Sequence, residues 1–370
     1  MTFIRQFVKN GQWRLVALAC LAIFATSACV TQIAEREFIP PVYPPPPEEP
    51  RFVWERMILS TADVEAEDRK TSLRRMLTGE RKGGIGLGKP YGVVVNKGRV
   101  FIGDTAASSV MALDFAEGAF FLVGDEDGPG QIYKPLGMTM DATGNLFIVD
   151  GAAKNVKMYT REGKWLTTIG AKGDFSRPTG VAVSADGSRV YVVDTGGVGS
   201  TKHHVVVYDV ASGDHLFDIG KRGDSPGEFN LPNNAMINID GNLYVVDGGN
   251  FRIQVFSPDG KFIRMIGSIG RQLGQFSRPK GIAHDEDGNI YVADAAFGNF
   301  QIFNIKGELL LFVGGRGSGG PAQFFLPAGI AVDEDGRVYM ADQFYRKIGV
   351  FRPANLQPED GCLGKIFSRR

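Results

Sequence analysis

A seven-residue motif occurs six times in this chain of 370 residues, at nearly even intervals. Each copy is a short hydrophobic run that ends in aspartate, as in GNIYVAD at 288–294. The motifs end at Asp104, Asp150, Asp194, Asp247, Asp294 and Asp342, and successive ends lie 46, 44, 53, 47 and 48 residues apart. A proline precedes every copy at a nearly fixed place, and in five of the six units a glycine follows that proline two residues later. This period indicates that one structural unit is repeated six times.

Each unit is predicted to form four short β-strands. In the fifth unit, apolar and polar residues alternate through GIAHD (281–285), NIYVAD (289–294), FQIF (300–303) and GELLLFVG (307–314). Such alternation is typical of half-buried strands, and the Asp, Gly and Asn residues between them favour tight hairpin turns. The 49 glycines and 26 phenylalanines of the chain fit short strands better than long helices. Four-stranded units that recur about every 40–50 residues predict a β-propeller.

The two ends of the repeat region predict how the ring closes. The sixth unit stops after its third strand, KIGVF at 347–351, whereas an unassigned strand, RFVWERMIL at 51–59, precedes the first unit. Pairing 51–59 with the sixth unit would leave no open sheet edge. The fold class is therefore predicted to be all-β, a six-bladed β-propeller over 51–353 that an N-terminal strand closes. A short helical insert is expected at 60–82, and 354–370, with Cys362, form a C-terminal tail.

Residues 1–28 are predicted to be an export signal. Three bases and no acid lie in 1–14, and the apolar run at 15–25 is too short to span a bilayer. The small residues before Cys29 resemble the lipobox of bacterial lipoproteins, in which that cysteine is diacylated. Thr26 departs from the aliphatic residue that the lipobox usually has three positions before the cysteine. The alternative is ordinary signal-peptidase cleavage near Ala28, which would leave a free thiol.

Residues 29–50 would then comprise the lipid anchor and a proline-rich stalk. Seven of the 11 residues at 40–50 are proline, which favours extended polyproline II at about 3.1 Å per residue. Removal of 1–28 leaves 38 bases against 41 acids, a net charge of −3. Export and this charge make nucleic acid an unexpected partner.

The repeats resemble NHL repeats. A phenylalanine and a proline, followed by strands like GIAVD, IYVAD and RIQVF, are matched almost completely at 229–260 and 276–303, and the resemblance covers about 84–353. Together with the lipobox and the proline stalk, the chain is similar to a group of bacterial NHL-repeat lipoproteins often found with multihaem cytochromes. The resemblance implies an envelope protein partner, such as a multihaem cytochrome or its export machinery. Val30, in place of aspartate after Cys29, favours the outer membrane.

The sequence contains no recognisable catalytic constellation, and no metal or cofactor is expected. His284 beside Asp285 and Asp287 suggests a cation site, but the same turn recurs at 333–337, which favours a hairpin. Some NHL propellers are lyases that hold zinc with histidines from separate blades. The four histidines of this chain do not follow that placement, and there is no G-x-S-x-G motif.

The six repeated aspartates are expected to form a ring on one face, near the mouth of the central channel. A carboxylate at the end of a strand readily accepts hydrogen bonds from backbone N–H groups of the following loop, which is the favoured role. A ring of six acids would also attract cations to the channel mouth.

Two departures from the plain repeat predict a partner-binding face. The insert at 60–82 has Ser60 and Asp63 in the positions of a capping pair, with acids early and bases late. The second departure is the longer loop at 195–204. Both belong to connections that emerge on the same side of a propeller. The residues chosen for this face are Leu73, Arg74, Arg75, Met76, His203 and His204.

The function predicted from these features is that of a lipid-anchored, monomeric, non-enzymatic scaffold outside the cytoplasm. The alternative is a metal-dependent lyase or hydrolase, or a small-ligand binder, that uses the channel mouth.

Overall fold

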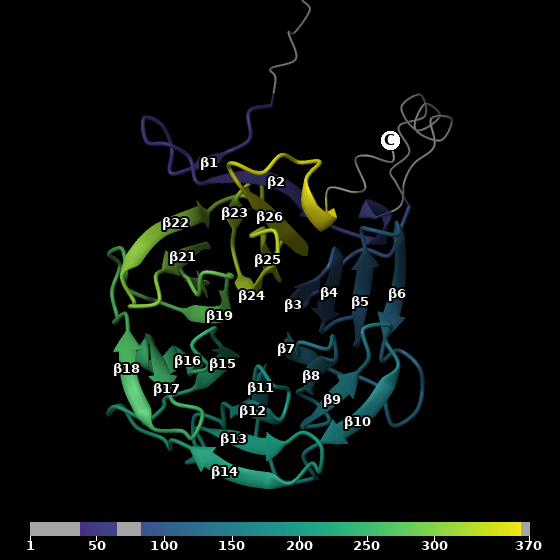
Figure 1. The fold of residues 1–370 in the computed structure, drawn as a ribbon, viewed down its shortest axis with the longest axis vertical. Helices are drawn as coiled ribbons and strands as arrows, with labels where there is room; N and C mark the ends of the chain where they lie inside the picture. Colours follow the sequence, from purple (N-terminus) through teal and green to yellow (C-terminus); the bar gives the residue numbers. More distant parts are fainter. Residues whose placement is uncertain (1–37, 65–82, 364–370) are drawn as a thin grey trace, which may run out of the picture. The chain divides into compact units, whose positions relative to one another are not determined.

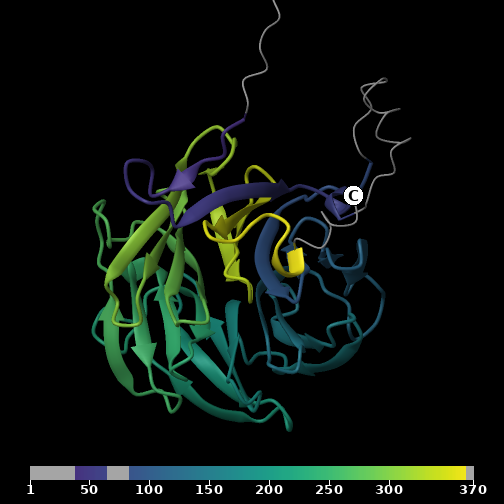
Figure 2. The same ribbon diagram turned by 45° about the horizontal axis from the view of Figure 1, so that its top comes forward.

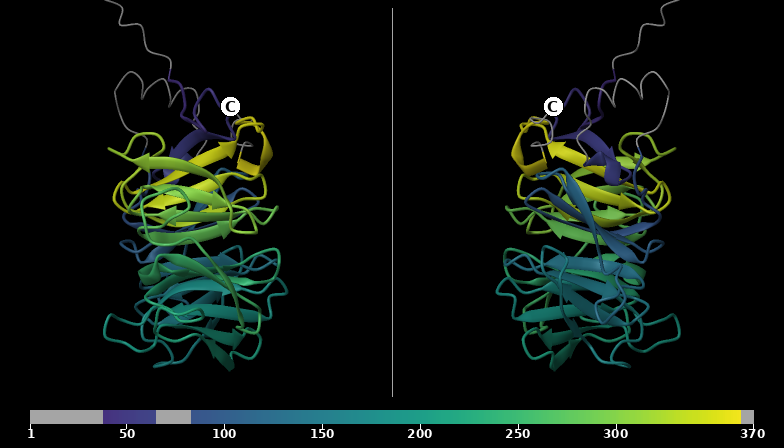
Figure 3. Two further views of the ribbon diagram at one scale, coloured as in Figure 1. Left: turned by 90° about the vertical axis from the view of Figure 1, so that its left-hand side faces the viewer. Right: turned by 90° about the vertical axis from the view of Figure 1, so that its right-hand side faces the viewer.

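Six antiparallel sheets surround a central channel in the computed structural model, which describes residues 38–64 and 83–363 (Figure 1). The innermost strands of the sheets are β3 (Pro90–Asn96), β7 (Pro135–Met140), β11 (Pro178–Val183), β15 (Pro232–Ile237), β19 (Pro279–His284) and β24 (Pro327–Val332). Each begins at one of the repeated prolines. The predicted all-β, six-bladed propeller is therefore confirmed, and Figure 3 shows the same blades from the edge of the ring.

The other strands follow in chain order within each blade. The second strands are β4 (Arg99–Asp104), β8 (Leu146–Asp150), β12 (Arg189–Asp194), β16 (Leu243–Asp247), β20 (Ile290–Asp294) and β25 (Val338–Asp342). The third strands are β5 (Ser109–Asp114), β9 (Asn155–Tyr159), β13 (His204–Asp209), β17 (Arg252–Phe256), β21 (Asn299–Phe303) and β26 (Lys347–Pro353). The outer strands of blades 1–5 are β6 (Ala119–Val123), β10 (Trp165–Ile169), β14 (His215–Ile219), β18 (Phe262–Ile266) and β22 (Leu309–Arg316), and the two-residue β23 (Gln323–Phe324) adds parallel to β22.

Burial explains the strand sequences. All five residues of β8, β16, β20 and β25 are buried, because the second strand lies between neighbouring blades on both faces. The outer strands are instead mostly exposed or half-buried; in β18 half-buried and exposed residues alternate, and only the last residue, Ile266, is buried. Continuous apolar runs and alternating runs therefore mark two different depths in the same blade.

The N-terminal strand closes the ring as predicted. β2 (Phe52–Ile58) pairs antiparallel with β26, from Phe52 opposite Pro353 to Ile58 opposite Ile348. Figure 2 shows this purple strand beside the yellow C-terminal strands. At the same place the buried Arg337 donates from Nε to Glu55 Oε2 at 2.9 Å.

Residues 40–50 are not an extended stalk. β1 (Val42–Tyr43) pairs with β2 as a fifth strand of blade 6, and the Arg51 and Trp54 N–H groups donate to the Tyr43 and Pro41 carbonyls. The Tyr43 ring meets the Phe351 ring edge-on, 6.2 Å between centroids. Proline is compatible with an edge strand, and the apolar contact of Tyr43 favours packing over extension.

In five blades a glycine lies two residues after the repeated proline, because neighbouring inner strands approach too closely there for a side chain. A Cβ at Gly92, Gly137, Gly180, Gly281 or Gly329 would lie 2.4–2.6 Å from the backbone of the neighbouring inner strand. Blade 4 has Asn234 in this position, at the contact between blades 4 and 5. There, Asn233 Nδ2 donates to the Pro279 carbonyl at 3.2 Å and joins the two blades.

Only the start of the predicted helical insert lies in the described residues. A 3-10 turn, η1 (Thr61–Asp63), has Ser60 as its cap, and Asp63 Oδ2 accepts from the Ser60 N–H, so the predicted capping pair is confirmed. Residues 65–82, with Leu73, Arg74, Arg75 and Met76, lie outside the described residues. Within 38–64 and 83–363, no helix has the length and apolar character to cross a membrane.

Candidate binding face

Two kinds of connection share one face of the ring. Because strands alternate in direction, the segments from second to third strand, and from the outer strand to the next inner strand, emerge together. We call this the connection face, and we call the opposite side, with its tight hairpins, the turn face. The six motif aspartates end the second strands and so lie at the connection face.

Five of the six aspartates hold the connection face together through their carboxylates. Asp104 accepts from the N–H groups of Gly88 and Lys89, which precede the inner strand. It also accepts from the N–H groups of Ala106 and Ala107, which lie in the loop between the second and third strands. The same pattern recurs at Asp150, Asp294 and Asp342. Asp194 shares it with a single donor from the loop, the Gly196 N–H. The predicted bonds to the loop N–H groups are confirmed, and those to the preceding segment were not anticipated.

This bonding agrees with the favoured structural role of the ring and counts against the alternative, attraction of cations to the channel mouth. The six carboxyl residues are at most 1% exposed and none lines the central cavity described below. Backbone donors surround the five carboxylates, so they are directed into their own blades. They fix the backbone of the connection face and are not presented to cations in the channel.

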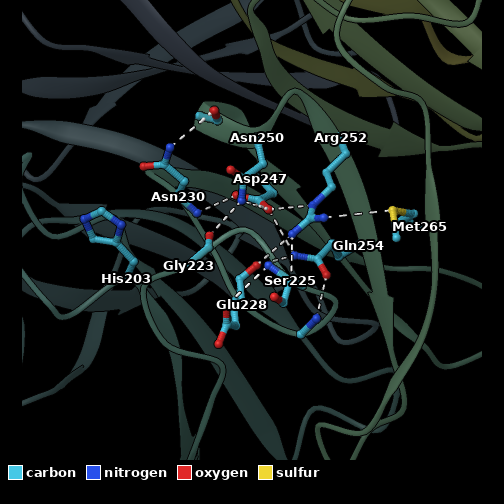
Figure 4. Close-up of polar contacts among 12 residues, drawn as sticks. His203, Gly223, Ser225, Glu228, Asn230, Asp247, Asn250, Arg252, Gln254 and Met265 are labelled. Atoms are coloured by element: carbon cyan, nitrogen blue, oxygen red, sulfur yellow. Dashed lines mark hydrogen bonds and ion pairs between the residues drawn. The ribbon is translucent and has the colours of Figure 1, made fainter.

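Asp247 of blade 4 is bonded differently (Figure 4). Besides the Asn230 N–H it accepts from the side chains of Asn250, Arg252 and Gln254, at 2.8–3.0 Å. Burial raises the pKa of Asp247, while these donors act in the opposite direction. Arg252 and Gln254 also donate to the Glu228 carbonyl, so the side chains of β17 support the segment that leads into the blade.

His203 is a structural residue and not an exposed one. In blade 4 the Leu231 N–H, in the position that donates to aspartate in the other blades, donates to His203 Nδ1 at 3.2 Å. His203 Nε2 lies 3.0 Å from the Gly197 carbonyl, to which it donates because Nδ1 is the acceptor. The side chain is 0% exposed. The long loop of blade 3 therefore supports blade 4, and His203 is unavailable to a partner.

His204 belongs to a small polar group at the side of blade 3. Its Nδ1 lies 3.1 Å from Asp218 Oδ2, and His215 Nε2 lies 2.8 Å from Asp218 Oδ1. Asp218 thus joins the two rings. His204 Nε2 is 3.7 Å from Asp194 Oδ2. Across the described part of the chain, no group of three or more His, Cys, Asp and Glu residues is arranged to hold a metal ion.

Basic residues lie at the connection-face ends of four of the six inner strands, and we call this set the basic rim. It consists of Lys89, Lys134, Arg177, Arg278 and Lys280, which flank the prolines that begin four of the inner strands. The backbone N–H of each of the first four donates to an aspartate of the ring. The buried acids therefore place the bases at equivalent points around the opening. Burial lowers the pKa of Lys280, and the charges of Arg278 and Arg177 lower it further.

The channel contains a cavity of about 490 Å³ bounded by all six inner strands. Its walls are mainly apolar, with Met138, Met140 and Met236 among them, and Tyr91 lines it as well. His284 lies in its wall as the last residue of β19, consistent with the strand position expected from sequence. Its Nδ1 donates to the Asp285 carbonyl at 2.9 Å, so Nε2 is left as an acceptor.

The suspected cation site beside His284 is a hairpin turn. Asp285 accepts from the N–H groups of Asp287 and Asn289, from Asn289 Nδ2 and from the Tyr291 hydroxyl. Gly288 has φ of 77°, the left-handed conformation that the turn requires. The carboxylate is satisfied within the turn.

Exposed large apolar side chains lie on the outer strands, such as Trp165 of β10 and Phe312 of β22, and in the connections between strands. Within the described chain, we compared the exposed large apolar side chains that lie in connections between strands or between blades. Eight of them lie on the connection face, and one, Ile239, lies on the turn face. The eight are Leu59, Ile85, Tyr133, Val198, Ile269, Leu273, Phe325 and Phe344. Two of them are in contact: the ring centroids of Phe325 and Phe344 are 4.5 Å apart with the planes tilted by 39°, and the Arg316 guanidinium lies 4.3 Å from the centroid of the Phe325 ring.

Comparison with known proteins supports the fold. No family model matches the chain. It is 30% identical over 144 residues to a probable peptidyl-alpha-hydroxyglycine alpha-amidating lyase of Caenorhabditis elegans, covering 36% of this chain and 39% of that protein. It is 26% identical over 141 residues to human NHL repeat-containing protein 2, covering 30% of this chain and 19% of that protein. The chain thus spans well under half of either relative.

A solved structure agrees over a longer stretch. A Bacteroides thetaiotaomicron protein of unknown function superposes with a TM-score of 0.57 at 19% identity, over 80% of this chain and 75% of that one. At such identity the likeness concerns the fold alone. Taken with the repeats and the six closed sheets, these comparisons define the chain as an NHL-repeat-like six-bladed β-propeller.

Proposed function

We propose that this protein is a non-enzymatic interaction scaffold that binds another protein on its connection face. The observation that carries the proposal is the distribution of exposed large apolar side chains among the connections, where eight lie on the connection face and one lies on the turn face. Exposed aromatic residues grouped with arginine are typical of the energetic centres of protein interfaces. Because the basic rim is positively charged, we expect the surface of the partner that faces it to be acidic.

The rigidity of this face supports the same role. The backbone N–H groups of Tyr133, Phe325 and Phe344 donate to Asp150 and Asp342. Three exposed aromatic residues are thereby held on connections that the aspartates fix. A preorganised surface loses less conformational entropy on binding.

The cellular setting is part of the proposal. Cys29 would be acylated after removal of 1–28, and the ring would lie outside the cytoplasm at the outer membrane. The partner would be an envelope protein, such as a multihaem cytochrome or a component of its export machinery. Since 40–50 pack on blade 6, residues 30–39 would be the tether. Cys29 and residues 30–37 lie outside the described residues.

The test is capture of the tagged full-length protein from crosslinked envelopes, with Phe344→Ser and Cys29→Ser variants in parallel. A partner that binds the purified wild-type ring directly, and binds Phe344→Ser at least tenfold more weakly, supports the proposal. Cys29→Ser should change the membrane fraction and leave this direct affinity unaltered. Equal affinity for wild type and Phe344→Ser would contradict it.

A lyase or small-ligand-binding role is the second candidate. It is favoured by the channel cavity, with His284 Nε2 available as a proton acceptor in its wall, and by the partial similarity to a protein named as an amidating lyase. Turnover that is lost in His284→Gln would support this candidate over the scaffold.

A further inference from the structure

The inner strands have free edges that face the channel. Each is the end strand of its sheet and pairs only with the second strand of its own blade. In the described ranges 38–64 and 83–363, no backbone hydrogen bond joins one inner strand to another. The backbone N–H and C=O groups on these edges therefore lack partners from a neighbouring strand, and such groups need water or a ligand.

The hairpin bonds show which residues present these groups. The Asp285 N–H donates to the Asn289 carbonyl, so Asp285 and every second residue before it in β19 face β20. Successive residues of a strand direct their N–H and C=O groups to opposite sides, so those of His284 and Ile282 point into the channel. By the same pairing in the other blades, the equivalent residues are Val93, Val95, Met138, Met140, Val181, Val183, Ala235, Ile237, Ile330 and Val332. All of them except Val181 line the cavity.

The cavity is narrow toward the connection face and opens on the turn face. Its narrow end lies where neighbouring inner strands meet: a Cβ at Gly329 would be 2.5 Å from the Tyr91 carbonyl oxygen. Its lining includes Ala142 and Ala185 of the turn-face hairpins, which are exposed, and no residue of the basic rim. A ligand would therefore enter from the face opposite to the one proposed for the partner protein.

The interior of the cavity holds little charge. Asp141 is the only carboxylate among the described residues of the lining, which include no lysine or arginine. The Asp141 carboxylate already accepts from the Thr143 and Asn145 N–H groups of its own turn. Burial of a charged group without a partner is costly, so this lining favours an uncharged ligand.

Asn234 adds a side-chain amide at the narrow end. It stands where the other five inner strands have glycine, and it lines the cavity. Its Oδ1 accepts from the Ala235 N–H at 2.9 Å, whereas its Nδ2 donates to no group in the described part of the chain. Asn234 Nδ2 is therefore available to a ligand as a donor, and His284 Nε2 is available as an acceptor.

We propose that the channel cavity is a binding site for a small uncharged amide with apolar substituents. An amide group offers one donor and one acceptor, which is what the free edge of a strand pairs with in a sheet. Flanking side chains, such as Val95, Val183 and Val332, contact the apolar substituents. The volume of about 490 Å³ lies within the range of small-molecule sites. The assignment rests on the second candidate function and is independent of the partner protein.

The test is titration calorimetry of the purified full-length protein with N-acetyl-leucine methylamide, with N-acetyl-leucine methyl ester and with the N-acetyl-leucine anion. The methylamide should bind at one site per chain. The ester, which lacks one N–H donor, should bind roughly tenfold more weakly, and the anion should not bind. The proposal is overturned if the methylamide does not bind wild type, or if the ester or the anion binds as tightly.

Two exposed alanines on the turn face provide matched variants. Ala185→Trp places a large side chain at the cavity mouth and should weaken methylamide binding roughly tenfold or more. Ala211→Trp makes the same change in the outer β13–β14 turn, away from the cavity lining, and should leave binding unchanged. Both variants should unfold at the wild-type temperature without ligand, because neither position is buried. Wild-type affinity in Ala185→Trp, or an equal loss in both variants, would overturn the assignment.

Discussion

Arg337 Nε donates to Glu55 Oε2 at 2.9 Å, and both side chains are at most 3% exposed. The pair joins the strand before the first repeat to the last blade, 282 residues away in the chain. Arg337 also donates to the carbonyls of Gln357 and Asp360, so one guanidinium holds the closing strand and the segment after β26 together.

Loss of this pair is expected to weaken ring closure strongly. Glu55→Ala leaves the buried Arg337 Nε without its carboxylate, although the 3.3 Å pair between Arg337 Nη1 and Asp335 remains, and it should lower the free energy of unfolding by about 3 kcal/mol. Asp259→Ala breaks the exposed pair with Arg189 and should cost under about 1 kcal/mol. Urea denaturation measures both, and similar losses would contradict the assignment.

Replacing the carboxylate of one ring aspartate by an amide should lower the free energy of unfolding. Asp294→Asn keeps the shape but replaces one acceptor oxygen with a donor that faces backbone N–H groups of Ser277 and Arg278. The expected loss is about 1–3 kcal/mol. The matched control is Asp287→Asn, in an exposed position of the neighbouring hairpin, which should unfold within about 0.5 kcal/mol of wild type.

The close approach of the inner strands predicts an asymmetry between blades 3 and 4. A Cβ at Gly180 would lie 2.6 Å from Asn234 Cα, so Gly180→Ala should destabilise the ring by more than about 2 kcal/mol. Asn234→Ala keeps the existing Cβ and should cost less than half as much. Equal costs in denaturant unfolding would show that the strands are not in contact there.

Asp333 should make the ring less stable as pH rises. Burial raises its pKa to about 7, above the ordinary value of 3.8, so the folded chain binds its proton more tightly than the unfolded chain. The resulting stability is fully present below about pH 4 and is lost as pH rises through 7. Asp333→Asn should flatten the unfolding free energy over this interval.

The control for Asp333 is its counterpart in blade 5. Asp285 accepts the same backbone and tyrosine donors and is less buried. Asp285→Asn should leave the slope between pH 4 and 7 as in wild type. A slope that persists in Asp333→Asn would assign the pH dependence to another group.

Much of the fold was predictable because its information is local and repeated. Strand depth, turn chemistry and the aspartate at the end of each second strand recur in every unit, and the missing fourth strand of the last unit specified the closure by 51–59. The fold-back of 40–50 was not predictable, because a proline-rich composition favours extension and the contact of Tyr43 with Phe351 is known only from the packed ring. The burial of Leu363 against blades 6 and 1 is equally non-local.

The candidate site was predictable only in part. The start of the insert and the 195–204 loop do lie on one face, as predicted, and the role of that face in binding stays a prediction. His203 was misjudged because its partner, Leu231, lies in the next blade. The basic rim was missed although its signal was present: four of the six repeat prolines directly follow Lys89, Lys134, Arg177 or Arg278. Their common position became meaningful once the aspartates were seen to hold those backbones.

The central claim is that the connection face binds a protein partner, and site-specific photocrosslinking tests it most directly. A photoreactive residue is placed at Phe344 on the connection face or at Ile239 on the turn face, both of them exposed apolar positions, in the full-length protein in intact envelopes. The account predicts one recurring crosslinked protein from position 344, lost when Tyr133 is replaced by serine, and none from position 239. The same protein crosslinked equally from both faces, or none from position 344, would contradict it.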